Sequence, residues 1–353
     1  MAGKFFNYLW YQRGLVPNLL RLCVWPFLWP LAQLFTWLAK RRKDHYLSGL
    51  KPAFQAEIPV IVVGNINVGG TGKSPVTIWV VEQLLSQGYQ PGVVSRGYGG
   101  QPDQYPHLVN SSDDASTVGD EPLMIHLRTG VPVVVDPDRA SAVQALRLNH
   151  NVNVIVSDDG LQHYPLSRTF ELLVVDGVRG FGNGQQLPLG PLREPLSRAA
   201  EVDAIIINGG TASDPIHCQV RELNQHCFVM NLEPGHLVPF NSESKTLLDN
   251  DSVVEMQSVA GIGNPQRFFD TLDTLKIKHQ PRSFNDHHSY SVSDVEQLQR
   301  KFVVTTEKDA VKLARFRQLR GAYLPVNARV QDGLIDVIIH SINDFRQHNR
   351  HRY

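Results

Sequence analysis

The sequence VIVVGNINVGGTGKS at residues 60–74 decides the fold class. Its first four residues are apolar and β-branched, which is typical of a strand buried on both faces. A glycine-rich turn follows, and apolar residues then recur at helical spacing from Val76 to Leu85. This order predicts a phosphate-binding loop, because glycines let backbone N–H groups converge on phosphate oxygens at the positive end of a helix. We therefore expect an α/β fold of the P-loop NTPase type, with a mostly parallel sheet flanked by helices.

The loop supplies the predicted nucleotide-binding residues. Lys73 would reach the β- and γ-phosphates, and the Ser74 hydroxyl would bind Mg²⁺. The general pattern has glycine where this chain has Asn67, but asparagine adopts a positive φ more readily than most residues. The alternative is a glycine-rich turn that binds no nucleotide. The predicted set is Asn67, Val68, Gly69, Gly70, Thr71, Gly72, Lys73 and Ser74.

Composition sets outer limits on the function. The chain has 353 residues, of which 42% are hydrophobic and 19% are charged, so one large or two moderate domains with a sizeable core are expected. The formal net charge of +0 argues against bulk nucleic-acid binding. Cys23, Cys218 and Cys227 form no zinc or CxxC pattern, which indicates a reducing compartment.

The N-terminal residues 1–45 differ from the rest. No residue from Leu22 to Ala39 is charged, and Lys40–Lys43 are all basic. Length alone would permit a membrane span. Pro26 and Pro30 interrupt the run, and aromatic residues are spread through it, so we favour attachment at the membrane interface over a single span or a helix packed on the protein. The basic cluster would contact anionic headgroups.

The remaining chain predicts two α/β regions. We expect a nucleotide-binding core at 46–228, a smaller domain at 229–330 and a closing helix within 331–353. Expected core strands are 93–95, 131–135, 152–156, 172–175 and 204–207, with a helix at 139–148. In the smaller domain we expect strands at 229–232, 237–240, 256–260, 302–305 and 323–330 and helices at 265–275 and 310–316. The amphipathic stretch 334–345 is the expected closing helix.

Two pairs of acids are candidates for metal binding. Asp158 and Asp159 end an apolar strand, where an acid of a P-loop enzyme holds Mg²⁺ directly or through water. Asp120 and Glu121 precede Pro122 at an expected helix start, and four acids exceed what turns and helix caps need. We predict that Glu121, Asp158 and Asp159 act with Ser74 at the metal.

Several basic and polar residues are predicted to contact an anionic substrate. Each follows a strand or lies in a loop rich in glycine or proline, and taken singly each arginine is more often structural. A different loop holds Asp286, His287 and His288, where a histidine could serve as general base. The predicted substrate contacts are Arg96, Tyr98, Arg139, His163 and Arg193.

Taken together, these motifs resemble the tetraacyldisaccharide 4′-kinases of lipid A biosynthesis. The shared segments are Gly64–Pro75, SRGYG at 95–99, GDEP at 119–122, DDGLQH at 158–163, PLREP at 191–195 and DHH at 286–288. The resemblance implies transfer of the ATP γ-phosphate to the 4′-hydroxyl of a tetraacyldisaccharide 1-phosphate, at the cytoplasmic face of a Gram-negative inner membrane. It also implies that Asp120 and His287 form the catalytic pair with Lys73, with His288 as the competitor for the role of base.

Two other readings compete with this one. A membrane-associated nucleotide switch would act on a partner protein. A guanine-specific switch should contain the motifs Asn-Lys-x-Asp and Asp-x-x-Gly, and the nearest candidates, Thr306-Glu307-Lys308-Asp309 and Asp158-Asp159-Gly160, do not fit them. A ligase or kinase with a soluble substrate would leave the apolar N-terminal segment unexplained. We expect ATP, Mg²⁺, the glycolipid and the inner-membrane surface as partners, without nucleic acid or an obligate protein partner.

Overall fold

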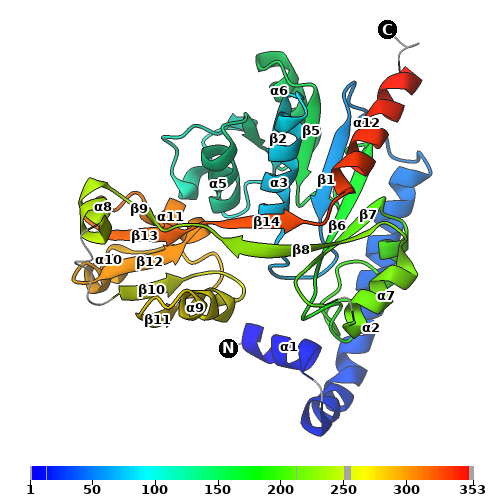
Figure 1. Ribbon diagram of the computed structural model, residues 1–353. Helices are drawn as coiled ribbons and strands as arrows, with labels where there is room; N and C mark the ends of the chain where they lie inside the picture. Colours follow the sequence, from blue (N-terminus) through cyan, green and yellow to red (C-terminus); the bar gives the residue numbers. More distant parts are fainter. Residues whose placement is uncertain (1, 13, 212, 250–255, 350–353) are drawn as a thin grey trace. The chain divides into compact units, whose positions relative to one another are not determined.

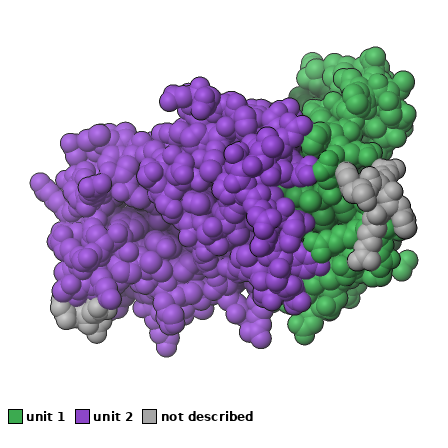
Figure 2. Space-filling view, turned by 90° about the horizontal axis from the view of Figure 1, so that it is seen from above, with its two compact units in different colours: residues 1–76, 154–231, 330–353 green, residues 77–153, 232–329 purple. Residues whose placement is uncertain are grey.

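A computed structural model describes residues 2–12, 14–211, 213–249 and 256–349 (Figure 1). The chain forms two compact units, which Figure 2 shows in different colours. Unit 1 contains residues 1–76, 154–231 and 330–353, and unit 2 contains residues 77–153 and 232–329. The sequence predicted domain boundaries after residues 45, 228 and 330. The two units do not test these boundaries, which stay a prediction.

Unit 1 is built on parallel strands. Across the sheet they follow the order β8 (Cys227–Pro234), β7 (Ala204–Asn208), β6 (Phe170–Asp176), β1 (Val60–Gly64) and β5 (Val154–Asp158). β1, β5, β6 and β7 are buried along their whole length, which explains their nearly continuous apolar sequences. Val63 pairs in register with Asp158, so the loops after β1 and β5 leave the sheet side by side.

α12 (Leu334–Asn349) lies against β6 of this sheet, where Ser341 Oγ donates to the Thr169 carbonyl at 3.0 Å. α3 (Lys73–Ser86) begins directly after the glycine-rich loop, and its residues after Val76 belong to unit 2. The other helical segments of unit 1 are α1 (Ala2–Tyr11), α2 (Leu15–Leu47), the 3₁₀ helix η1 (Leu196–Ala200) and α7 (Pro215–Leu223).

The N-terminal helix α2 is long and largely exposed. It contains an 18-residue window of mean hydropathy 1.4 that is only 6% buried, so α2 has the length and composition of a membrane span. Part of it packs on the rest of unit 1, because Thr36 Oγ1 contacts Gln186 Oε1 at 2.8 Å and Lys43 pairs with Glu201. Pro26 and Pro30 lie inside this helix, which continues through both residues. Pro26 and Pro30 have no backbone N–H, so each leaves out one hydrogen bond of the helix. The two prolines are one turn apart, and both missing bonds are therefore on the same side of the helix.

Unit 2 combines two groups of strands. The first group is β2 (Pro91–Ser95) parallel to β4 (Val133–Val135), with β3 (His107–Leu108) antiparallel to β4. The second is a sheet of order β11 (His279–Ser283), β10 (Met256–Ala260), β12 (Phe302–Thr306), β13 (Gly321–Leu324) and β9 (Val238–Pro239), parallel except at β9. The remaining elements are β14 (Val326–Val330), α4 (Ala115–Val118), α5 (Asp120–Thr129), α6 (Arg139–Asn149), α8 (Ser242–Asp249), α9 (Pro265–Thr274), α10 (Val292–Leu298) and α11 (Glu307–Leu313).

The second sheet of unit 2 is covered on both faces. Phe302 and Val304 of β12 pack with Phe268, Phe269 and other apolar residues, while Val303 packs on the opposite face. This alternation follows from the two-residue period of a strand. The sheet therefore positions the segments that follow two of its strands: residues 285–288 come after β11, and residues 307–309 begin α11 directly after β12.

The α/β class with mostly parallel sheets is confirmed, and two local predictions are wrong. The expected strand at 323–330 is broken at Pro325, which has no N–H to continue a ladder, so β13 and β14 are separate strands. The helix expected at 310–316 begins at Glu307, because the Thr306 side chain accepts from the Asp309 N–H and caps it.

Candidate active site

The predicted nucleotide-binding, metal-binding and catalytic residues form two clusters, one in each unit. The loop cluster in unit 1 contains residues 67–74 with Asp158, Asp159 and Arg193. The histidine cluster in unit 2 contains Asp120, Glu121 and His287, together with two lysines of α11.

The glycine-rich loop is held in place by side-chain bonds to its backbone. Asn208 Nδ2 donates to the Thr71 carbonyl at 2.9 Å, and Asn67 Nδ2 donates to the Gly180 carbonyl at 2.9 Å. Gly72 has φ +94°, and a Cβ there would lie 2.4 Å from Asn208 Nδ2. Only glycine fits this position, so the loop reaches the first turn of α3 in one fixed path.

Two cations and one carboxylate lie together at the end of this loop. Lys73 Nζ is 3.5 Å from Asp159 Oδ1, and Arg193 Nη1 is 3.4 Å from Asp159 Oδ2. Burial raises the pKa of Asp159, but the charges of Lys73 and Arg193 outweigh it and hold this pKa below its usual value. The Lys73 side chain is only 11% exposed, so its charge acts where water screens it weakly.

The donor set of the loop cluster suits a hard divalent cation. Ser74 is in the first turn of α3 and Asp158 ends β5, and both are buried. Among the residues that the structure describes, no group of three or more His, Cys, Asp or Glu side chains is arranged as a metal site. Mg²⁺ in phosphate-transfer sites needs only one or two carboxylates, because phosphate oxygens and water complete its octahedron. A hydroxyl with one or two acids is therefore sufficient.

Sequence reasoning missed Arg179, which closes the other side of the loop. Arg179 Nη2 donates to the Gly70 carbonyl at 2.5 Å and pairs with Asp176 at 3.4 Å. Asp176 ends β6, and its Oδ1 accepts from the Arg179 N–H at 2.8 Å. An acid directly after a buried strand was the available signal, as it was for Asp158.

The histidine cluster is centred on a bond between Asp120 and His287. Their Oδ2 and Nδ1 atoms are 3.2 Å apart, although 167 residues separate them in the chain. Asp120 is the first residue of α5, and its Oδ1 accepts from the Glu121 N–H at 2.9 Å. His287 has φ +56°, in the left-handed region that few residues other than glycine adopt. His288 makes a different bond, from Nε2 to Asp294 at 3.2 Å.

The pair shifts both titrations. The hydrogen bond with Asp120 raises the pKa of His287, and neither burial nor the charge of Lys308 cancels it. Burial raises the pKa of Asp120, but the hydrogen bond with His287 and the charges of Lys308 and Lys312 hold this pKa below its usual value. Asp120 is therefore an anion at neutral pH and favours a proton on Nδ1.

Sequence reasoning also missed Lys308 and Lys312. Lys308 Nζ is 3.2 Å from Glu121 Oε1 and 3.3 Å from His287 Nε2. Lys312 Nζ is 3.7 Å from Asp120 Oδ2. Burial lowers the pKa of Lys308, but the nearby carboxylates outweigh it and raise this pKa, so the side chain is cationic. The signal was present in residues 306–309, a polar run at the junction where the buried strand β12 ends and α11 begins.

The predicted substrate contacts are dispersed. Tyr98 is 62% exposed and its ring lies edge-on to His287, with centroids 4.9 Å apart. Arg96 is exposed in the same loop. Arg139 is buried, and its Nη1 donates to the Asp136 carbonyl at 2.9 Å. His163 belongs to the turn after β5, where its N–H donates to the Gly160 carbonyl at 2.9 Å. Their substrate roles stay predictions.

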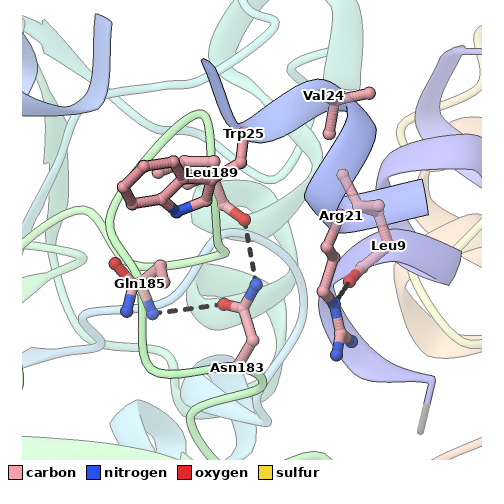
Figure 3. A pocket seen from close by; sticks show the side chains of 7 residues that line it. All are labelled: Leu9, Arg21, Val24, Trp25, Asn183, Gln185 and Leu189. Atoms are coloured by element: carbon pink, nitrogen blue, oxygen red, sulfur yellow. Dashed lines mark hydrogen bonds between the residues drawn. The ribbon is translucent and has the colours of Figure 1, made fainter. Parts of the chain in front are cut away.

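Unit 1 also contains a cavity of about 270 Å³ beneath the N-terminal helices (Figure 3). Arg21 lines it, but the guanidinium is directed to the carbonyls of Leu9 and Gln12, each 2.6 Å away, and to Asn18. The volume is below the roughly 300–1,000 Å³ of most ligand pockets. It is too small for a glycolipid with several acyl chains. The lining residues are Leu9, Arg21, Val24, Trp25, Asn183, Gln185 and Leu189.

Comparisons with known proteins give a consistent result. Residues 24–343 match the family model for LpxK, tetraacyldisaccharide-1-P 4′-kinase. Proteins named tetraacyldisaccharide 4′-kinase are similar over most of their length. Those of Photobacterium profundum and Pseudomonas aeruginosa are 46% and 42% identical over 332 and 320 residues, covering 92% and 90% of this chain and 91% of each relative.

A solved structure supports the fold. It is LpxK from Aquifex aeolicus, described as an "apo" form in complex with ATP, and it matches with a TM-score of 0.71 at 24% identity. The match covers 92% of this chain and 99% of that chain. At this identity the likeness establishes the arrangement of elements alone.

Proposed function

The chain belongs to the tetraacyldisaccharide-1-P 4′-kinase family, and from this premise we propose how its residues act. The substrates are ATP and a tetraacyldisaccharide 1-phosphate. The reaction transfers the γ-phosphate to the 4′-hydroxyl and gives the 1,4′-bisphosphate, lipid IVA, which is the precursor of lipid A. A non-catalytic nucleotide switch is not favoured, because the relatives are named as kinases.

The loop cluster binds the nucleotide. Backbone N–H groups of the glycine-rich loop hold the phosphates, apart from that of Val68, which donates to the Pro191 carbonyl at 2.9 Å. The ammonium of Lys73 neutralises charge on the β- and γ-phosphates. Ser74 with Asp158 and Asp159 would hold Mg²⁺, with Glu121 as a further predicted ligand, and the bound ion would supply charge neutralisation at the transferring group. Arg193, now paired with Asp159, is a second cation for the anionic ligands.

The histidine cluster activates the acceptor. A sugar hydroxyl is a weak nucleophile at neutral pH, and a base that takes its proton as the bond to phosphorus forms speeds the reaction. His287 is the base through Nε2, and Asp120 orients the ring and stabilises the imidazolium, as in other His–Asp pairs. His288 is less suited to the role, because its Nε2 is engaged with Asp294, a residue that also caps α10.

Helix α2 brings the enzyme to its lipid substrate at the cytoplasmic face of the inner membrane. Apolar side chains such as Leu22 and Phe27 are 73% and 77% exposed, and burial of each in lipid contributes roughly 1.5–3 kcal/mol. The basic run Lys40–Lys43 follows and would contact anionic headgroups. The contacts of α2 with unit 1 favour interfacial attachment over a complete span.

The bond between Asp120 and His287 is the observation that carries this proposal. The test is incubation of the full chain with γ-labelled ATP and tetraacyldisaccharide 1-phosphate in detergent micelles, followed by chromatography. We expect label in the lipid for the wild type and for His288→Ala, and almost none for His287→Ala. Label released only as free phosphate would contradict a lipid kinase, and a defect confined to His288→Ala would reassign the base.

A further inference from the structure

Lys308 lies directly in front of the ring nitrogen through which His287 would act as a base. Its Nζ is 3.3 Å from Nε2 of His287, the ring nitrogen that faces away from Asp120. An ammonium group has hydrogens to donate and no lone pair, so the nitrogen that faces it must be an acceptor. The carboxylate of Asp120 has the opposite character and requires a hydrogen on Nδ1. The two neighbours therefore define one tautomer of the ring.

The charges around the imidazole oppose one another. Among the described residues, the groups facing the ring are Asp120 of α5, Asp286 beside it in the chain, Lys308 of α11 and the edge of Tyr98. Asp286 Oδ1 is 3.9 Å from Nε2, and both carboxylates favour a second proton on the ring. Lys308 is the cation in contact with the ring. The other nearby cation, Lys312, pairs with Asp309 at 2.7 Å and lies 3.7 Å from Asp120.

We propose that Lys308 is a positioning residue for the phosphoryl transfer, which opposes protonation of Nε2 of His287 and directs this nitrogen at the acceptor hydroxyl. This inference rests on the proposed function and adds a residue that the catalytic pair alone does not include. In the step, the O–H bond of the sugar breaks as Nε2 takes the proton, and the oxygen bonds to the γ-phosphorus. The bond from that phosphorus to its bridging oxygen breaks, and ADP leaves with the electron pair.

The substrate hydroxyl can take the place of the Lys308 hydrogen bond to His287 while the ammonium group stays near the ring. The hydroxyl must replace the Lys308 N–H at Nε2, and Glu121 and Asp286 offer the ammonium other acceptors at 3.2 and 3.9 Å. The Lys308 side chain is 15% exposed, so its charge continues to act on the ring after this exchange. Imidazolium formed in the step is then destabilised by Lys308 and readily gives up its proton to water.

The test measures the titration of His287 directly, in the full chain in detergent. Proteins with ring-labelled histidine are titrated by NMR, and His287→Gln assigns the resonance. In Lys308→Met we expect the His287 midpoint to rise by about one pH unit, because a cation in contact with the ring is lost. Lys308→Arg keeps the charge, and Lys301→Met removes a lysine that contacts Gln280 instead; both should leave the midpoint in place.

The kinetic arm follows the same variants. The acidic limb of the kcat profile should move upward with the NMR midpoint in Lys308→Met and remain unmoved in Lys308→Arg. An unchanged or lower His287 midpoint in Lys308→Met would overturn the proposal. So would an acidic limb of the kcat profile that does not move when the NMR midpoint rises. If the wild type transfers no phosphate to the glycolipid, the proposed function fails, and the NMR midpoint alone decides whether Lys308 controls the protonation of His287.

Discussion

The substitution Asp120→Asn replaces a carboxylate, whose two oxygens each accept a hydrogen bond in this protein, by a side-chain amide. Oδ1 accepts from the Glu121 N–H at 2.9 Å, and Oδ2 accepts from His287 Nδ1 at 3.2 Å. Asparagine has one oxygen and one NH₂ group, so one of the two bonds must be lost. If the NH₂ group faces His287, Nδ1 becomes the acceptor and the hydrogen moves to Nε2, which can then no longer take a proton. If it faces Glu121, two donors oppose each other at a cost of about 1–3 kcal/mol.

Either arrangement weakens the base. Loss of positioned general base catalysis lowers rates by about 10²–10⁴-fold, or roughly 3–5 kcal/mol of transition-state stabilisation. We expect a fall in kcat of this size with ATP affinity preserved, measured by steady-state turnover and by calorimetric titration with ATP. The double variant with His287→Ala should be little slower than either single variant, because the two residues act as a unit.

A matched control is available in the same unit. Asp294 contacts His288 at 3.2 Å, the same distance as in the catalytic pair, and it caps α10. Asp294→Asn should lower stability while kcat stays within about threefold of wild type, as for changes away from a reacting centre. Near-normal kcat in Asp120→Asn, or an equal loss in Asp294→Asn, would refute the reasoning.

Three further outcomes follow. Lys73→Ala should lower kcat at least about 10²-fold while circular dichroism shows an intact fold, because this side chain acts on phosphate charge; normal turnover would remove the loop from the mechanism. Changing both Leu22 and Phe27 to Ser should weaken binding to anionic vesicles at least about tenfold in a flotation assay. The control Leu148→Ser, which alters an exposed leucine outside α2, should leave binding unchanged. If the double variant binds as well as the wild type, attachment lies elsewhere. The raised pKa of His287 puts the acidic limb of kcat above the ordinary value of about 6.5, with activity lost as pH falls and His287 is protonated; in Asp120→Asn the limb should move down, and an upward shift would contradict the pair.

The loop was predictable because its signal is local. A strand buried on both faces, a glycine-rich turn and a helix start are adjacent in the chain, and β1 and α3 lie where the pattern places them. Strand ends were nearly as visible, since Asp158 closes an apolar run and parallel strands end at one edge of a sheet. The fold class followed from this repeated pattern.

Long-range partners were not predictable from local pattern. Nothing in the composition or periodicity brings residue 120 to residue 287, and only the family resemblance joined them. Lys308 was missed because residues 306–309 were weighed as a nucleotide-recognition motif and then set aside. The cap from Thr306 to Asp309 was overlooked for the same reason, and this shifted the expected helix by three residues. Pro325 was read as part of one strand, although its missing N–H ends the ladder there.

The carbon that receives the phosphate distinguishes a 4′-kinase from every other use of ATP by this chain. Product made from ATP and tetraacyldisaccharide 1-phosphate is to be purified and examined by two-dimensional proton–phosphorus NMR. We expect one new phosphorus resonance that correlates with the proton at the 4′ carbon, in addition to the resonance of the original 1-phosphate. A new phosphate at any other carbon, a pyrophosphate at the 1-position, or an unaltered lipid with ATP consumed would contradict the proposed function.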